Sequence, residues 1–323
     1  MEMVSYGVGQ LTPYINWIYY LHAWGIKPRF AGAASVHDCP ACREAWVRSF
    51  PADDQAQATE ALRLCHDSLH LLASLERQKL QVRACFHLAR AASQGDDHLL
   101  DGLRRPLLRQ QQVRPGEPCL CLSDFVRPLQ GGEAVDRVGL FATSVDTGGR
   151  KRDDASGGRK PDDASGGRRR DDATATPGVG DDPYRELMMQ TLSDRLAEAA
   201  VERLHLYVRR EAWGYAPDEQ LAIPALLNER FQGIRPAVGY PSLPDQSVIF
   251  LIDRLLPLSQ IGIRLTESGA MHPHASTCGL MFAHPAARYF AVGQIDEEQL
   301  ADYARRRGLP TQEMRRFLQA NLG

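Results

Sequence analysis

The 323-residue sequence has no surplus of charge of either sign and no long apolar run. It contains 38 Lys and Arg against 40 Asp and Glu. A nucleic-acid or membrane-surface function would need a local basic patch, and the one basic cluster is diluted by acidic residues. No segment approaches the length of a membrane span, and Met1 to Gln10 lacks the charged and then apolar pattern of a signal peptide. We expect a cytoplasmic protein that binds neither nucleic acid nor a membrane.

Cysteines do not occur in the even, regularly spaced set that a disulfide framework requires. There are seven, scattered along the chain, which favours free thiols. His37 lies beside the motif Cys39-Pro40-Ala41-Cys42, which could be a metal-binding or redox pair. However, no second CxxC motif follows, and the context is not a strand leading into a helix as in thioredoxins. We therefore expect no metal-ligating residues.

One segment has no apolar residue larger than Ala. A nonapeptide repeats three times in tandem, from Gly148 to Ser156, Gly157 to Ser165 and Gly166 to Thr174. Such a sequence cannot bury enough surface to offset the entropy of ordering, so we expect a disordered insert at about 146–180. A nucleic-acid tether is one interpretation, and a repeat expansion tolerated in a surface loop is the simpler one.

The rest of the chain, 43% hydrophobic overall, has the periodicity of helices and strands. Apolar residues at helical spacing predict long helices at 53–78 and 183–210. Alternating or short apolar runs predict strands at 82–88, 119–123 and 138–144. Strands at 261–267, 278–283 and 289–295, separated by short turns, suggest an antiparallel meander.

Two helices are expected to close the chain. Asp296 provides a helix start, Gly308 a stop, and Pro310 opens the last helix. Strands grouped apart from helices favour an α+β fold.

The segment Gln232 to Pro244, QGIRPAVGYPSLP, combines fixed and flexible backbone positions. Proline fixes φ and glycine permits close approach, so backbone groups can be held facing a small molecule. Arg235 offers a two-pronged donor for a carboxylate. The alternative is a well-packed connector with a solvated Arg.

Within it, Arg235 to Pro241, RPAVGYP, resembles the signature segment of the activation domain of cobalamin-dependent methionine synthase. Further similar pieces occur in the family's order: YINW at Tyr14 to Trp17, LSDFV at Leu122 to Val126, SDRLAEA at Ser193 to Ala199, WGYAP at Trp213 to Pro217, LTESGAM at Leu265 to Met271, FAHP at Phe282 to Pro285, and YFAVGQI with DYARRRG near the end. The resemblance covers the whole chain except the insert.

This resemblance implies a single C-shaped α+β domain, 1–323, built on a twisted antiparallel sheet with flanking helices. It also implies an S-adenosylmethionine site along a shallow surface. In that site Arg235 binds the methionyl carboxylate, and backbone groups line the adjacent edge. Paired aromatic residues meet the adenine or the sulfonium, and an acidic residue lies nearby. The remaining positions implied for this site are Ala237, Gly239, Tyr240, Tyr289, Phe290 and Glu229.

Asn16 departs from the family, where an Asp holds the ligand's ammonium group. An amide oxygen still accepts a hydrogen bond but carries no charge, so we expect lower affinity. The alternative is that Asn16 is simply a helix cap.

The resemblance also implies the chemistry. The sulfonium activates its own methyl group, and cobalt(I), formed by one-electron reduction of cobalt(II), is the nucleophile, so the protein mainly aligns the two. We expect no catalytic residue, and Arg235 acts as a clamp. His272 and His274 lie in AMHPHAS, which matches a loop that faces the corrin. They could touch the cobalamin or form an exposed turn, and two histidines without a third ligand are weak evidence for a metal.

A cobalamin-ligand motif, Asp-x-His-x-x-Gly, is missing, as are the homocysteine and folate barrels. We therefore expect a partner chain that carries cobalamin, together with a flavodoxin-like or other low-potential electron donor. The chain would be the reactivation component of a split methionine synthase, or would reactivate another corrinoid protein. A non-catalytic S-adenosylmethionine-sensing or assembly module is the third alternative.

Overall fold

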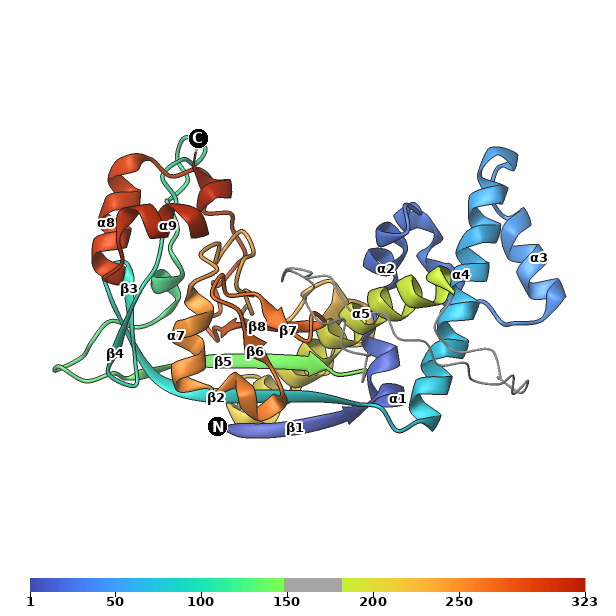
Figure 1. Ribbon diagram of the computed structural model, residues 1–323, viewed down its shortest axis with the longest axis horizontal. Coiled ribbons are helices and arrows are strands. Elements are labelled where there is room, and N and C mark those ends of the chain that lie inside the picture. Colours follow the sequence, from blue (N-terminus) through green and yellow to red (C-terminus); the bar gives the residue numbers. More distant parts are fainter. Residues whose placement is uncertain (148–181, 323) are drawn as a thin grey trace, which may run out of the picture.

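A computed structural model describes residues 1–147 and 182–322. The nonapeptide insert expected at about 146–180 lies almost entirely outside the described residues. In Figure 1 the molecule is C-shaped: the long strands form its middle, one group of helices rises at each end, and the interior of the C faces upward. Mixed helices and an antiparallel sheet confirm the expected α+β class.

A six-stranded antiparallel sheet forms the middle of the molecule. Its order is β4-β3-β2-β5-β8, and β1 also pairs with β2, along the half of β2 that β3 leaves free. β2 has 14 residues, which lets it carry both partners on one edge and β5 on the other. The strands are β1 (Glu2–Gly7), β2 (Gln81–Gln94), β3 (Asp97–Leu100), β4 (Leu103–Pro106), β5 (Asp136–Val145) and β8 (Ser276–Met281), with a separate ribbon of β6 (Arg264–Leu265) and β7 (Met271–His272).

Both faces of the sheet are covered, because alternate residues of β2 enter different hydrophobic clusters. Val82, Ala84 and Phe86 pack with the helices on one face, whereas Cys85 and Ala89 pack on the other. On the first face α5 (Pro183–Tyr207) packs on β2, β5 and β8, and α1 (Val8–Leu11), α2 (Trp17–Ala23) and α4 (Ala52–Arg77) pack against α5, with α3 (Pro40–Arg48) against α4. The other helices are α6 (Ile223–Leu227), α7 (Val248–Leu255), α8 (Glu297–Arg307) and α9 (Thr311–Phe317).

The strongest sequence signals are confirmed. The helices expected at 53–78 and 183–210 are α4 and α5, and the second ends in a π-helical turn at Val208–Ala212. The carboxylate of Asp296 accepts a hydrogen bond from the backbone N of Gln299 (2.8 Å), and Gly308 ends α8 with a left-handed φ of 68°.

Three expected strands are wrong or reduced. Residues 119–123 make a single bridge, from Cys121 to Arg109, and then enter a 3-10 turn, because the carboxylate of Asp124 accepts a hydrogen bond from the backbone N of Cys121. In the region expected as a strand at 261–267, only Arg264–Leu265 pairs, and its partner is β7. β8 pairs with β5, so there is no meander.

Residues 289–295 do not form a strand because their backbone is bound by a loop. The backbone N of Phe290 donates to the Ser242 hydroxyl (3.0 Å), and that of Val292 donates to the carbonyl of Pro241 (2.8 Å). Val292 and Ile295 are instead buried against α8 and α9. Among the described residues, no helix is both long and apolar enough to cross a membrane.

Candidate functional site

The signature segment lies against the free edge of β8. The backbone N of Val238 donates to the carbonyl of Cys278 (3.0 Å), and that of Leu280 donates to the carbonyl of Pro236 (3.0 Å). Gly279 permits this approach, because a Cβ there would lie 2.2 Å from the Pro236 carbonyl oxygen. The segment therefore extends the sheet, and the sheet holds its backbone rigidly.

A tight turn ends this pairing and exposes an aromatic side chain. Gly239 has a φ of 84°, and its backbone N donates to the carbonyl of Leu243 (2.9 Å). The backbone N of Leu243 in turn donates to the carbonyl of Tyr240 (2.8 Å). The Tyr240 side chain is 57% exposed, so it is available to a ligand.

Arg235 points from the segment toward α5. Its Nη2 donates to a carboxylate oxygen of Glu202, and its guanidinium carbon lies 5.3 Å from the ring centroid of Phe231. Its backbone N donates to the Tyr289 hydroxyl (3.1 Å). Its Nη1 is buried and has no hydrogen-bond partner among the described residues. One prong of the guanidinium is thus used internally, and the other still lacks an acceptor.

A row of carboxylates on α5 faces the segment. Asp194, Glu198 and Glu202 are spaced by four residues and therefore share one helix face. Burial raises the pKa of Glu202, against the lowering effects of Arg235 and Arg209. Burial likewise raises the pKa of Glu198. Two further guanidinium groups lie among these carboxylates. Arg195 pairs with Glu198 (2.8 Å), and the buried Arg209, which pairs with Glu219, lies 4.1 Å from the centroid of the same Phe231 ring.

The row also connects the signature segment to the AMHPHAS loop. Nδ1 of His274 lies 3.6 Å from a carboxylate oxygen of Asp194. Burial raises the pKa of Tyr240, and the charge of Glu198 adds to this shift. Two segments far apart in the sequence therefore lie along one helix.

Comparison with known proteins identifies the family. A family model described as vitamin B12 dependent methionine synthase, activation domain, matches residues 7–163 and 167–308. The chain belongs to this family. Its structure is also similar to a crystal structure described as the MetH reactivation domain bound to AdoHcy, with a TM-score of 0.77 and 32% sequence identity. That match covers 100% of this chain and 90% of the other.

Several positions expected in the activation-domain site converge in space. Arg235 and Tyr289 are in direct contact, and Ala237, Gly239 and Tyr240 follow on the same edge. Glu229 has a left-handed φ of 55° and is exposed. Burial is the largest cause that raises the pKa values of Glu202 and Tyr289, and the negative charge of Glu229 also raises both.

Two expected positions have structural partners of their own. The side-chain oxygen of Asn16 accepts a hydrogen bond from the backbone N of Ile18 (3.1 Å), so Asn16 caps α2. The ring of Phe290 is partly buried, with its centroid 6.4 Å from that of Phe125. Of the aromatic pair, Tyr289 is the more exposed.

The sequence analysis missed Glu202, Glu198 and Asp194. Their spacing in SDRLAEAAVE shows that they share a helix face, but it does not show that Arg235 lies against that face. No pattern within the sequence links residues 202 and 235. The pairing therefore emerges only from tertiary structure.

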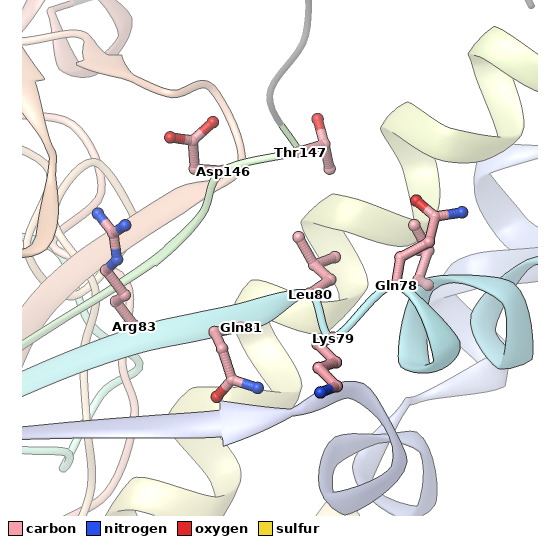
Figure 2. A pocket seen from close by; sticks show the side chains of 8 residues that line it. Gln78, Lys79, Leu80, Gln81, Arg83, Asp146 and Thr147 are labelled. Carbon is pink, nitrogen blue, oxygen red and sulfur yellow. The ribbon is translucent and has the colours of Figure 1, made fainter.

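A cavity elsewhere in the fold does not involve these residues. Its volume is about 440 Å³, and Figure 2 shows it between the end of α4, the start of β2 and the residues Asp146 and Thr147. Leu75, Lys79 and Arg83 are among its lining residues. None of the expected ligand positions lines it.

Proposed function

We propose that this activation-domain protein binds S-adenosylmethionine along the signature segment and α5. There it supports the reductive remethylation of cob(II)alamin carried by a partner chain, in methionine biosynthesis. In this role it is the reactivation component of a cobalamin-dependent methionine synthase and acts in trans. The solved relative's description, a reactivation domain bound to AdoHcy, supports a ligand of this class.

The unsatisfied nitrogen of Arg235 carries the proposal. A buried guanidinium nitrogen without an acceptor is costly, and a carboxylate is the group that the guanidinium fork fits best. Since Glu202 already accepts from Nη2, the guanidinium is held in one orientation, with Nη1 buried and unpaired among the described residues. The ligand's methionyl carboxylate would complete its hydrogen bonding.

The other residues orient the ligand and supply no proton. The carboxylates of α5 provide acceptors for an ammonium group, and Tyr240 and Tyr289 provide aromatic surface for the adenine or the sulfonium. When bound, S-adenosylmethionine supplies a methyl group that its sulfonium already activates. The chain therefore acts by alignment.

Calorimetric titration of the purified chain with S-adenosylmethionine and S-adenosylhomocysteine tests the site. Arg235→Ala should weaken S-adenosylmethionine binding by about 10- to 100-fold, because a charge-assisted hydrogen bond contributes about 1.5 to 3 kcal/mol. Arg230→Ala is the matched control, because Arg230 is exposed and lies only five residues away. Arg235→Lys keeps the charge but loses the fork and should also bind weakly. Equal binding by Arg235→Ala and Arg230→Ala would remove Arg235 from the site.

A second assay tests the action in trans. The chain is mixed with a cobalamin-bearing chain in the cob(II)alamin state, S-adenosylmethionine and a flavodoxin-like or other low-potential donor. The spectrum should convert to that of methylcobalamin, and S-adenosylhomocysteine should form in equal amount. If S-adenosylmethionine binds but no corrinoid partner is methylated, the sensing or assembly role is favoured instead.

A further inference from the structure

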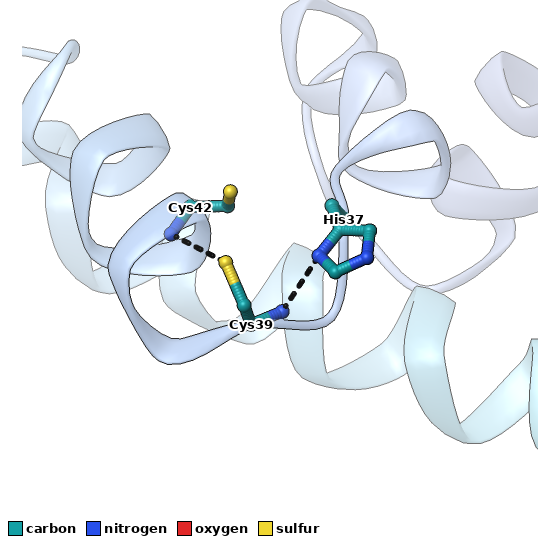
Figure 3. Close-up of side chains that lie close together, drawn as sticks. All are labelled: His37, Cys39 and Cys42. Atoms are coloured by element: carbon teal, nitrogen blue, oxygen red, sulfur yellow. Dashed lines mark hydrogen bonds between the residues drawn. The ribbon is translucent and has the colours of Figure 1, made fainter.

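Three metal-ligating side chains meet at the end of the molecule farthest from the sheet. His37, Cys39 and Cys42 lie in the loop before α3 and in its first turn, as Figure 3 shows. A ring nitrogen of His37 and the two sulfur atoms all lie within 4.8 Å of one another. His37 and Cys42 are exposed, Cys39 is only half-buried, and α3 has no fully buried residue, so core packing does not account for the cluster.

The loop that carries these side chains is held in place. The Cys39 sulfur accepts a hydrogen bond from the backbone N of Cys42 (3.3 Å), and the backbone N of Cys39 donates to Nδ1 of His37 (3.2 Å). Between them, Asp38 lies beside α4, with a carboxylate oxygen 2.8 Å from Nδ1 of His66. The ligand atoms are therefore brought together before any ion binds.

The position also favours the form of cysteine that binds metals. Thiolates are the ligands, and a helix N-terminus stabilises negative charge. Cys39 is the N-cap residue of α3, so its sulfur lies at this N-terminus.

We propose that His37, Cys39 and Cys42 bind a thiophilic divalent metal ion such as Zn²⁺, with the fourth position open to solvent or to a partner. Two sulfur ligands at 2.3 Å from a tetrahedral ion lie about 3.7 Å apart. The cluster, with separations of up to 4.8 Å, needs a contraction of only about 1 Å to reach this geometry. A Cys-x-x-Cys pair with one His is a recurrent zinc ligand set. The proposal is independent of S-adenosylmethionine binding at Arg235.

The test uses the full chain, fully reduced and freed of metal. Zn²⁺ is titrated in competition with a chromophoric chelator, and Co²⁺ is titrated separately to observe the sulfur-to-cobalt charge-transfer band and the visible bands of tetrahedral cobalt. We expect one equivalent per chain and both sets of bands. Cys42→Ser should lower Zn²⁺ affinity by about 100-fold or more, because each ligand contributes a substantial share of the binding free energy. His37→Ala should weaken binding and change the cobalt spectrum.

Cys119→Ser is the matched control, because Cys119 is also a half-buried free thiol but lies outside the cluster. It should bind Zn²⁺ like the unmodified chain. Bound Zn²⁺ should also protect two thiols from an aromatic disulfide reagent and leave Cys119 reactive. The Cys39 side chain caps α3, so Cys39→Ser could fold poorly for a reason unrelated to metal binding. The Cys42 thiol does not cap the helix, so Cys42→Ser keeps the test valid. The proposal would be overturned if Zn²⁺ did not bind stoichiometrically, or if Cys42→Ser and Cys119→Ser bound it equally. It would also be overturned if Cys39 and Cys42 formed a disulfide and the reduced chain had no affinity for Zn²⁺.

Discussion

The buried pair of Arg235 and Glu202 should contribute measurably to folding. Their side chains are only 13% and 11% exposed, so water screens the interaction weakly. Arg235→Ala removes a hydrogen bond between charged groups, about 1.5 to 3 kcal/mol, and a cation–π contact with Phe231, about 0.5 to 1 kcal/mol. We expect the free energy of unfolding to fall by about 3 kcal/mol at neutral pH.

This loss should depend on pH through Glu202. Burial raises its pKa above the ordinary value of 4.5 even with Arg235 present, and removing Arg235 removes a lowering influence. An acid with a raised pKa in the folded state stabilises the protein fully below its unfolded pKa, and this stability is lost as pH rises through the folded pKa. The variant should therefore be most destabilised at pH 7 to 8 and regain stability toward pH 5.

Urea unfolding at several pH values measures both effects. With an m-value of about 3 kcal/mol per molar, the midpoint of Arg235→Ala should fall by about 1 M at pH 7.5. Glu202→Gln should cost less, and the double variant should cost less than the sum of the single variants, because the two residues interact. The reasoning fails if Arg235→Ala and the surface control Arg230→Ala unfold at the same midpoint, or if the penalty is no smaller at pH 5.

Two further predictions concern the ligand surface. Asn16→Asp should tighten S-adenosylmethionine binding about fivefold, because a charged acceptor replaces a neutral one while the cap of α2 is retained. A competitor without the amino group should gain nothing from the substitution. If calorimetry shows that both ligands respond equally, Asn16 has a structural role only. Gly279→Ala should push the signature segment away from β8, because the new Cβ would lie 2.2 Å from the Pro236 carbonyl oxygen, and should lower stability by about 1 to 3 kcal/mol and weaken binding. Gly32→Ala, whose Cβ would meet only a Trp46 atom at 3.9 Å, is the control in thermal melts. Equal effects of the two substitutions would contradict a close approach of the signature segment to β8.

The sequence predicted those elements whose signal is local and strong. The 26-residue α4 has regular apolar spacing and a clear end, so its bounds were predicted to within one residue. β2 was predicted only over residues 82–88, whereas it extends to Gln94, because its second half, ARAASQ, is small and polar. Residues 289–295 contain a short apolar run like that of a strand, but Val292 and Ile295 are buried against α8 and α9. Periodicity reports which side chains are buried and does not report which backbone groups pair.

In the candidate site, too, the residues with a local sequence signal could be predicted and those placed by tertiary packing could not. Arg235 and Tyr240 lie in a compact segment of unusual composition, so the sequence could single them out. Glu202 lies 33 residues earlier on a helix, and its contact with Arg235 depends on how α5 packs across the sheet. Asn16 shows a different limit. Its role as a helix cap depends only on neighbouring residues, so the sequence could offer it as one of two alternatives. A role in ligand binding is not local in this sense.

The charge of the site bears on which ligand it favours under the proposed function. Arg235 is paired with Glu202 and Arg195 with Glu198, so the remaining negative charge along this face is that of Asp194, which lies 3.6 Å from Nδ1 of His274. S-adenosylmethionine carries a carboxylate, an ammonium and a sulfonium, so its net charge is +1, whereas S-adenosylhomocysteine has lost the sulfonium charge and is neutral overall. Since the Asp194 side chain is 31% exposed, water screens its charge, and the difference should be modest. Under the proposed function, the negative charge of Asp194 beside the paired Arg235 would favour the methyl donor over its product and would assist release of the product once the methyl group has been transferred.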